Sequence, residues 1–196
     1  MSASVNATET TELEVLFEWA RAEVHEWEPK EPRAARLLSS DEAQTDAAKH
    51  CIVNAFRRGI PRRDAAIQRL AEITKGNARW YEADFRVEAL GRVALHPHWG
   101  RALQEWRRQN GLRACGAVVE EFAKYPMERG FRLRHEDPRT YRPIFISQNL
   151  EGPWRIAEGS HRCDALWKLS LTDAPQHKLP FKVFLGVHAR MNEWSA

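Results

Sequence analysis

The stretch Arg155-Ile156-Ala157-Glu158-Gly159-Ser160-His161-Arg162-Cys163-Asp164-Ala165-Leu166 decides how the rest of the chain is interpreted. Apolar and charged residues alternate up to Glu158, which predicts a strand. The small residues Gly159 and Ser160 then predict a tight turn, and the apolar residues that follow favour a helix from about Ser160. The segment therefore predicts a strand that passes through a short turn directly into a helix.

The turn has the chemistry of an anion site. Gly159 allows the backbone to bend and to approach a ligand closely, and Ser160 is expected to cap the helix. The first N–H groups of a helix point outward at the positive end of its dipole, which suits a bound anion. Arg162 is disfavoured by that dipole unless an anion is present, and His161 adds a second donor. The alternative is an ordinary capped helix with an exposed histidine and arginine.

Further strands are expected on both sides of this stretch. Residues 130–137 (GFRLRHED), 142–147 (RPIFIS) and 181–187 (FKVFLGV) have strand patterns. Together with the strand at 154–158 and the helix after Gly159, the C-terminal third predicts the order strand, strand, strand, helix, strand. Its composition differs from that of the helical residues before it, which suggests a unit covering residues 127–196.

The preceding residues have mainly helical patterns. Residues 1–10 are polar and are expected to be frayed. Helices are predicted over residues 11–28, 43–59, 62–75, 78–95, 98–109 and 112–124, with a strand over Leu13–Trp19 as the alternative within the first of them. We therefore expect an acidic N-terminal segment (1–42), a helical region (43–126) and the C-terminal core (127–196). The predicted fold class is α+β, with an N-terminal helical region followed by a small mixed sheet with helices.

Composition excludes several classes of protein. Of the 196 residues, 43% are hydrophobic, which is enough for a folded core. No run approaches the roughly 18 apolar residues of a spanning helix, so no membrane partner is expected. The first residues do not resemble a secretory signal. The three cysteines lie far apart without a CxxC pair, which is typical of a protein of the reducing cytoplasm.

The segments PIFIS (143–147), GPWRIAEGSHRCDALWKL (152–169) and LPFKVFLGV (179–187) resemble the core of the ParB/sulfiredoxin-like superfamily. Its members typically have a strand with Pro-Ile, a hairpin, and a strand that ends in a G-x-[HR]-R phosphate loop. A helix and a further strand follow. The resemblance covers roughly residues 128–188 and implies binding of nucleotide phosphates at Gly159, Ser160, His161 and Arg162.

The chain departs from two branches of this superfamily. Sulfiredoxin has its reactive cysteine immediately before the histidine, where this chain has Ser160, and Cys163 instead follows the arginine. Reduction of sulfinic acids is therefore not expected. ParB proteins carry a helix-turn-helix module after the domain, whereas this loop lies near the C-terminus. The resemblance is thus nearest to the small-molecule kinase-like members. In these an acidic residue often precedes the glycine, and Glu158 has that position in this chain.

This resemblance implies a nucleotide-dependent enzyme that binds ATP, ADP or CTP with Mg²⁺. The expected reaction is phosphoryl transfer to a small acceptor, or nucleotide hydrolysis. His161 and Arg162 would offset charge on the phosphoryl group. Glu158 would contact Mg²⁺ or accept a proton, although it could instead pair with a surface arginine. Glu136, or the neighbouring Asp137, is the candidate base, with a solvated turn before Pro138 as the alternative.

Charge leaves a second class of function open. The net charge is +3, yet residues 1–31 hold eight acidic and two basic residues, so the remainder is basic. Arginine-rich helix ends could contact a nucleic-acid backbone, or could simply complement helix dipoles; these residues are Arg57, Arg58, Arg62, Arg63, Arg107 and Arg108. A nucleic-acid-binding or regulatory protein is one alternative, and a non-catalytic sensor of a phosphorylated metabolite is another. His96 and His98 lack a third metal ligand in register, so no metal site is expected there.

Overall fold

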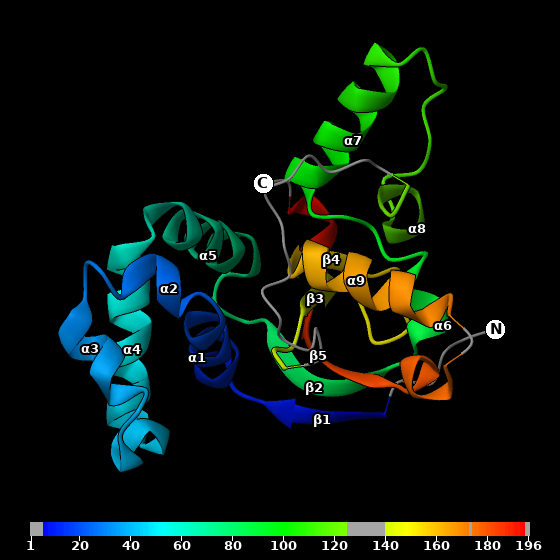
Figure 1. The fold of residues 1–196 in the computed structure, drawn as a ribbon. Coiled ribbons are helices and arrows are strands. Elements are labelled where there is room, and N and C mark those ends of the chain that lie inside the picture. Colours follow the sequence, from blue (N-terminus) through cyan, green and yellow to red (C-terminus); the bar gives the residue numbers. More distant parts are fainter. Residues whose placement is uncertain (1–5, 125–139, 173, 195–196) are drawn as a thin grey trace.

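The computed structural model describes residues 6–124, 140–172 and 174–194. They form one five-stranded sheet in the order β1-β2-β5-β3-β4, with helices packed on its faces (Figure 1). The fold is α+β, as the sequence predicts, with helices concentrated before the C-terminal strands. The strands are β1 (Asn6–Thr10), β2 (Arg79–Phe85), β3 (Ile144–Ser147), β4 (Arg155–Glu158) and β5 (Phe181–Val187).

The sheet is mixed. The pairs β1–β2, β2–β5 and β3–β4 are antiparallel, whereas β3 and β5 run parallel. Between the parallel strands β3 and β5 the chain first returns along the antiparallel strand β4, and α9 then connects β4 to β5 past the intervening strand β3. The start of α9 is thereby fixed at the end of β4, on the edge of the sheet.

Helices account for most of the remaining described residues. They are α1 (Glu12–Ala22), α2 (Val24–Trp27), α3 (Pro32–Leu37), α4 (Asp46–Gly59), α5 (Pro61–Thr74), α6 (Val87–Leu90), α7 (Pro97–Gln109), α8 (Val119–Phe122) and α9 (Ser160–Ser170). Short 3-10 helices cover Asp41–Gln44, Pro175–Lys178 and Met191–Glu193. Threonine caps begin two of the long helices, because the Thr11 and Thr45 hydroxyls accept the N–H groups of Glu14 and Ala48 at 3.2 Å.

Two hydrophobic cores form on the two faces of the sheet. In the first, side chains of α1, α4 and α5 pack on Trp80, Ile144, Ile146 and Phe184. In the second, α6, α7, α8 and α9 contribute to a core around Phe145, Ile156 and Leu185. In Figure 1 the helices α1–α5 accordingly lie to one side, while α9 lies against the sheet with α6 and α8 beside it. The adjacent β3 residues Phe145 and Ile146 point into opposite cores because side chains alternate along a strand.

Three expectations about the first half of the chain are wrong. The helix predicted over residues 78–95 is instead strand β2 followed by the single turn α6. Residues 6–10 are paired as strand β1 rather than frayed. The helix predicted over 112–124 is reduced to α8, because residues 111–118 run alongside α7 as extended chain. The sheet therefore takes two strands from residues for which only helices or a tail were expected.

The other predicted elements agree with the structure. The expected helices at 43–59, 62–75 and 98–109 appear as α4, α5 and α7, and the one at 11–28 appears as α1 and α2. The strands predicted at 142–147, 154–158 and 181–187 are present as β3, β4 and β5. The strand predicted over 130–137 lies outside the described residues. None of the helices in the described part of the chain has both the length and the apolar composition needed to cross a lipid bilayer.

Candidate functional site

The junction between β4 and α9 is built around Gly159. This residue is the N-cap of α9 and has a left-handed backbone, with φ of 94° and ψ of 25°. A Cβ atom there would lie 3.0 Å from Cβ and 3.2 Å from Cα of Pro143, at the start of β3. Glycine is thus required for both its conformation and its close approach to the neighbouring chain.

The N-cap of α9 is a glycine. Gly159 has no side chain with which to make the usual capping hydrogen bond. The expectation that Ser160 caps the helix is therefore wrong: Ser160 is the first helical residue, and it is buried. The 11-residue helix also has no acidic residue in its first turn. The positive end of its dipole is consequently left without a carboxylate from its own sequence.

His161 is held by aromatic side chains from two other helices. Its ring lies 4.6 Å from the ring of Trp99 in α7, measured between centroids, at an interplanar angle of 75°. The ring of Phe122 in α8 lies 6.0 Å away. These two aromatic contacts fix the imidazole plane beside the start of α9. Neither aromatic residue was singled out from the sequence, because they lie far along the chain in segments that look like ordinary core.

Arg162 stacks on an aromatic ring. Its guanidinium carbon lies 5.5 Å from the ring centroid of Tyr141, which precedes β3. Such stacking fixes a guanidinium group by its face and keeps its N–H donors available at the edge. No ion pair among the described residues includes Arg162. The structure thus brings His161 and Arg162 together in one helical turn, each against its own aromatic partner.

Glu158 lies at an irregularity in the hairpin. Ile144 pairs with Glu158 while Phe145 pairs with Ile156, so Ala157 is an extra residue on β4. This is a β-bulge, which re-aims side chains and is common beside functional sites. Glu158 is half-buried and immediately precedes Gly159. Its carboxylate therefore lies at this junction, directly before the glycine turn.

Two residues that follow the loop are buried in the protein. Cys163 is fully buried, and burial raises the pKa of its thiol far above the ordinary value. It is therefore a protonated core residue rather than a nucleophile. Asp164 is also buried; its Oδ2 accepts a hydrogen bond from Lys168 at 2.8 Å, while Oδ1 has no partner among the described residues.

The candidate catalytic base lies outside the part of the chain that the structure describes. Glu136 and Asp137 fall within residues 125–139, which lie outside the described residues. The chain is described again from residue 140, so Tyr141 and Pro143 are the described residues that lead into the site. The predicted base therefore remains a prediction.

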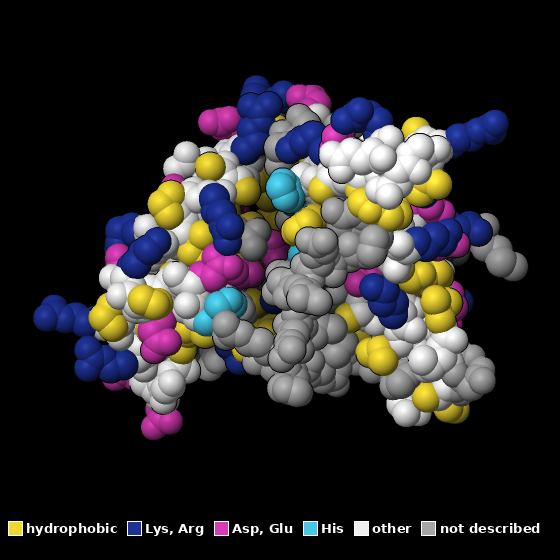
Figure 2. All heavy atoms as spheres, turned by 45° about the horizontal axis from the view of Figure 1, so that its top comes forward, with side chains coloured by type: hydrophobic (Ala, Val, Ile, Leu, Met, Phe, Trp, Pro, Cys, Tyr) yellow, Lys and Arg dark blue, Asp and Glu magenta, His cyan; other side chains and the backbone are white. Residues whose placement is uncertain are grey.

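The arginines suggested as a nucleic-acid surface are largely paired with carboxylates. Arg57 binds Asp64, Arg58 binds Glu31 and Arg62 binds Glu26, at 2.5, 2.8 and 2.5 Å. On α7, Arg108 binds Glu105 at 2.6 Å. Figure 2 shows basic and acidic side chains interspersed over the face it displays. These pairings neutralise the charges that a phosphate backbone would need.

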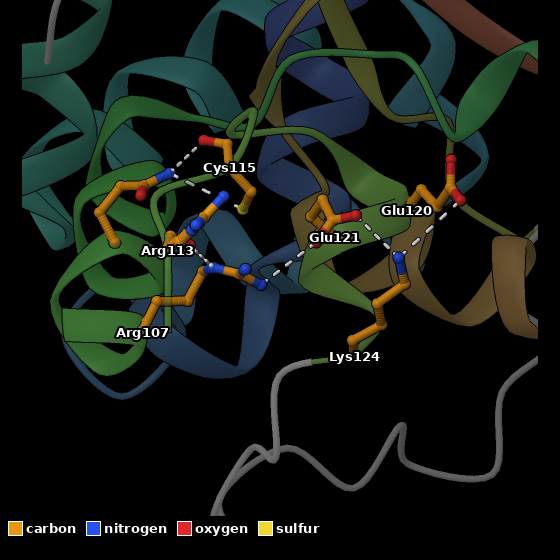
Figure 3. A network of polar contacts seen from close by, with 7 residues as sticks. Arg107, Arg113, Cys115, Glu120, Glu121 and Lys124 are labelled. Carbon is orange, nitrogen blue, oxygen red and sulfur yellow. Dashed lines mark hydrogen bonds and ion pairs between the residues drawn. The ribbon is translucent and has the colours of Figure 1, made fainter. Parts of the chain in front are cut away.

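Arg107, the other α7 arginine suggested for nucleic-acid binding, belongs to a polar network with α8. Arg107 donates to the carbonyl of Arg113 at 2.7 Å and pairs with Glu121 at 3.3 Å (Figure 3). Glu121 in turn accepts from Lys124 at 2.7 Å, and this hydrogen bond lowers the pKa of the carboxyl group. The network ties α7 to α8, and these are the helices that supply Trp99 and Phe122 to the site.

The histidines before α7 have a structural role. Nδ1 of His96 accepts the N–H of His98 at 3.2 Å and thereby caps α7. A different group within the described residues has metal-ligand spacing: one ligand atom each from Glu23, His25 and Glu26 lies within 4.8 Å of the others. This group was not predicted from the sequence. Its Glu26 carboxylate is already bound by Arg62.

Comparison of the chain with protein-family models, curated proteins and solved structures found no match. The fold and the site themselves define an α+β protein in which a glycine turn joins an edge strand to a helix. The helix begins at a glycine N-cap and carries a histidine and an arginine in its first turn, each held on an aromatic ring.

Proposed function

We propose that the protein is a nucleotide-dependent enzyme that binds the phosphates of ATP, ADP or CTP at Gly159, Ser160, His161 and Arg162. The reaction would be phosphoryl transfer to a small hydroxylated or amino-acid-like acceptor, or hydrolysis of the nucleotide. The proposal also includes a cytoplasmic location, where these nucleotides and Mg²⁺ are abundant. The resemblance of residues 128–188 to the ParB/sulfiredoxin-like superfamily is part of the same proposal.

The observation that carries this proposal is the composition of the first turn of α9. The turn contains no acidic residue, and its N-cap is a glycine with φ of 94°, which has no side chain to cap the helix. The first backbone N–H groups of a helix and its dipole favour an anion at such a place. Arg162 stacks on Tyr141, which holds its charge near those donors. A phosphate group would satisfy all of these groups at once.

The roles of the side chains follow from where they lie. Arg162 can form two parallel hydrogen bonds to phosphate oxygens, and His161 can donate a third from its fixed ring. Charge that develops on the transferring group is then met by donors that need no reorganisation. Glu158 supplies one carboxylate beside the loop. Mg²⁺ is normally bound by one or two carboxylates together with substrate phosphates, so this donor set fits the metal.

Calorimetric titration of wild-type protein with ATP, ADP and CTP in the presence of magnesium tests the proposed site. Replacing Arg162 with alanine should weaken binding by roughly tenfold or more, because a charge-assisted hydrogen bond is lost. Arg190→Ala is the matched control, since Arg190 is an exposed arginine near the C-terminus that pairs with Glu193. Equal nucleotide binding by all three proteins would contradict the assignment of the loop.

Turnover separates an enzyme from a sensor. Release of inorganic phosphate or of a nucleoside diphosphate should depend on Arg162 and on Glu158, and Glu158→Gln should lower the rate with magnesium while nucleotide still binds. Nucleotide binding with no turnover across a panel of small hydroxylated acceptors would instead support a sensor of a phosphorylated metabolite.

A further inference from the structure

The two edges of the sheet differ in how they are covered. At the β4 edge, the N–H of Ala94 donates to the carbonyl of Trp154 at 3.0 Å, and the N–H of Ile156 donates to the carbonyl of Ala94 at 2.8 Å. This bridge covers part of the outer side of β4. At the other edge, β1 pairs with β2 on its inner side, and no described residue pairs with its outer side (Figure 1). Strand β1 therefore offers a row of backbone donors and acceptors to a further strand.

Strand β1 also lacks the features that usually protect an edge strand. Its five residues, Asn6–Thr10, pair with β2 in an unbroken register, so no bulge twists the edge away. The strand contains neither proline nor lysine, which commonly block pairing at an edge. Its exposed side chains are those of Asn6, Thr8 and Glu9. A regular strand of this kind can accept another strand through main-chain hydrogen bonds.

The sequence of β1 is complementary to itself. When two copies of a strand pair antiparallel about a two-fold axis, residues that are opposite each other lie on the same face. With Thr8 opposite Thr8 of the second copy, every residue of the strand has a partner: Asn6 is opposite Thr10, and Ala7 is opposite Glu9. Threonine and asparagine side chains can hydrogen-bond across such a pair. A register centred on Glu9 would instead place two carboxylates directly opposite each other.

We infer that two copies of this chain associate through β1 as a two-fold antiparallel pair, which joins their two sheets into one continuous sheet. The partner is a second copy because the register that pairs every residue of β1 also keeps like charges from lying opposite each other. The interface is small, so we expect a dissociation constant of roughly 10–100 μM. Strands β1 and β4 lie at opposite edges of the sheet, so the inference is independent of nucleotide binding at Gly159.

Glu9 gives this association a distinctive response to charge. In the register centred on Thr8, the Glu9 side chains of the two copies are diagonal neighbours on one face, roughly 7–8 Å apart. They repel each other weakly, and salt screens that repulsion. Glu9→Gln should therefore tighten the dimer by about twofold or more, and added salt should act in the same direction. Attraction of β1 to a basic partner would respond with the opposite sign.

Sedimentation equilibrium of the full chain measures the association. The wild-type protein should show a monomer–dimer equilibrium. Thr8→Lys places two positive charges opposite each other at the two-fold axis and should raise the dissociation constant about tenfold or more. The Thr8 side chain is exposed, so the monomer should keep its fold, which circular dichroism checks. Thr172→Lys makes the same change at another exposed threonine and should leave the dimer unchanged.

Amide hydrogen exchange locates the contact. Residues 6–10 should be better protected at high than at low protein concentration, whereas Ile156 in β4 should show no difference. Nucleotide affinity should be equal in wild type and Thr8→Lys, which separates failure of this inference from failure of the proposed phosphate site. Should Thr8→Lys fail to fold, Glu9→Gln still decides the question. A wild-type chain that stays monomeric at roughly 500 μM, a dimer that Thr8→Lys leaves intact, or a dimer that Glu9→Gln weakens would overturn the inference.

Discussion

The indole of Trp99 meets the imidazole of His161 edge-on, with 4.6 Å between ring centroids. Trp99 belongs to α7 and His161 to the first turn of α9, so the contact links α7 to the start of α9. Trp99 also lies 5.7 Å from the ring of Phe122 in α8. The orientation of His161 therefore depends on helices that are distant from it in sequence.

Replacing Trp99 with alanine should lower both stability and nucleotide affinity. Loss of a large, half-buried ring and its aromatic contacts is expected to cost about 2 kcal/mol of unfolding free energy. Trp99→Phe keeps an aromatic partner for His161 and should retain most of the affinity. Chemical denaturation and calorimetric titration measure the two effects. If Trp99→Ala binds nucleotide as tightly as wild type, the ring does not position His161 for binding.

Replacing Gly159 with alanine should be more damaging than the same change at Gly111. Both glycines have positive φ angles, 94° and 67°, so both changes carry backbone strain of about 1 kcal/mol. Only at Gly159 does the new Cβ meet Pro143, at 3.0 Å, while nothing lies within 4 Å of it at Gly111. Urea unfolding of the two variants measures the difference, and equal losses would show that Pro143 moves aside freely.

Cys163 should resist alkylation in the folded protein. Its burial raises the thiol pKa, so at neutral pH it stays protonated, whereas Cys51 is exposed. Because the thiol pKa is higher in the folded state than the unfolded value of about 8.5, the protonated thiol favours the folded state below that pH. The contribution of Cys163 to the free energy of unfolding falls as the pH rises further. Mass spectrometry after brief treatment with iodoacetamide should find Cys51 labelled first. Native-state labelling of Cys163 at the same rate would contradict its burial.

The carboxyl group of Glu31 should titrate differently once Arg58 is removed. Hydrogen bonds from the Arg58 guanidinium, at 2.8 and 3.0 Å, lower the pKa of Glu31. Arg58→Gln should therefore raise that pKa toward its ordinary value, as followed by NMR titration of the side-chain carboxyl carbon. The pKa of Glu105, lowered chiefly by Arg108, should not change and serves as the internal control. A Glu31 titration unaffected by the substitution would show that the pair does not persist in solution.

Local patterns predicted the C-terminal elements because each is self-contained. The strand-turn-helix at Gly159 and the apolar strand 181–187 carry their signals in adjacent residues, and both are present. In contrast, β2 is covered on both faces, so its buried residues Trp80, Ala83 and Phe85 do not alternate regularly. Without that alternation the apolar spacing resembled a helix. Strand β1 is a mostly exposed edge that pairs through its backbone, so hydrophobicity gave no signal for it.

The site was predictable only where it is continuous in sequence. Gly159, His161 and Arg162 are adjacent and lie together at one helix start. Their aromatic partners Trp99 and Tyr141 come from other segments, and such tertiary contacts have no local signature. The role of Ser160 was misjudged by one position, because Gly159 itself serves as the N-cap and takes the place of a side-chain cap. Helix boundaries of this kind are uncertain by a residue or two.

The pairing of β2 with β5 affects how the chain can be made. Strand β2 (residues 79–85) pairs with β5 (residues 181–187) in the middle of the sheet. This part of the sheet therefore cannot form until almost all of the described chain has left the ribosome. Until then β2 presents an unpaired apolar edge, and β1 alone can cover only one side of it. Nascent chains stalled before Phe181 should therefore be prone to aggregation and should depend on chaperones that hold exposed strands.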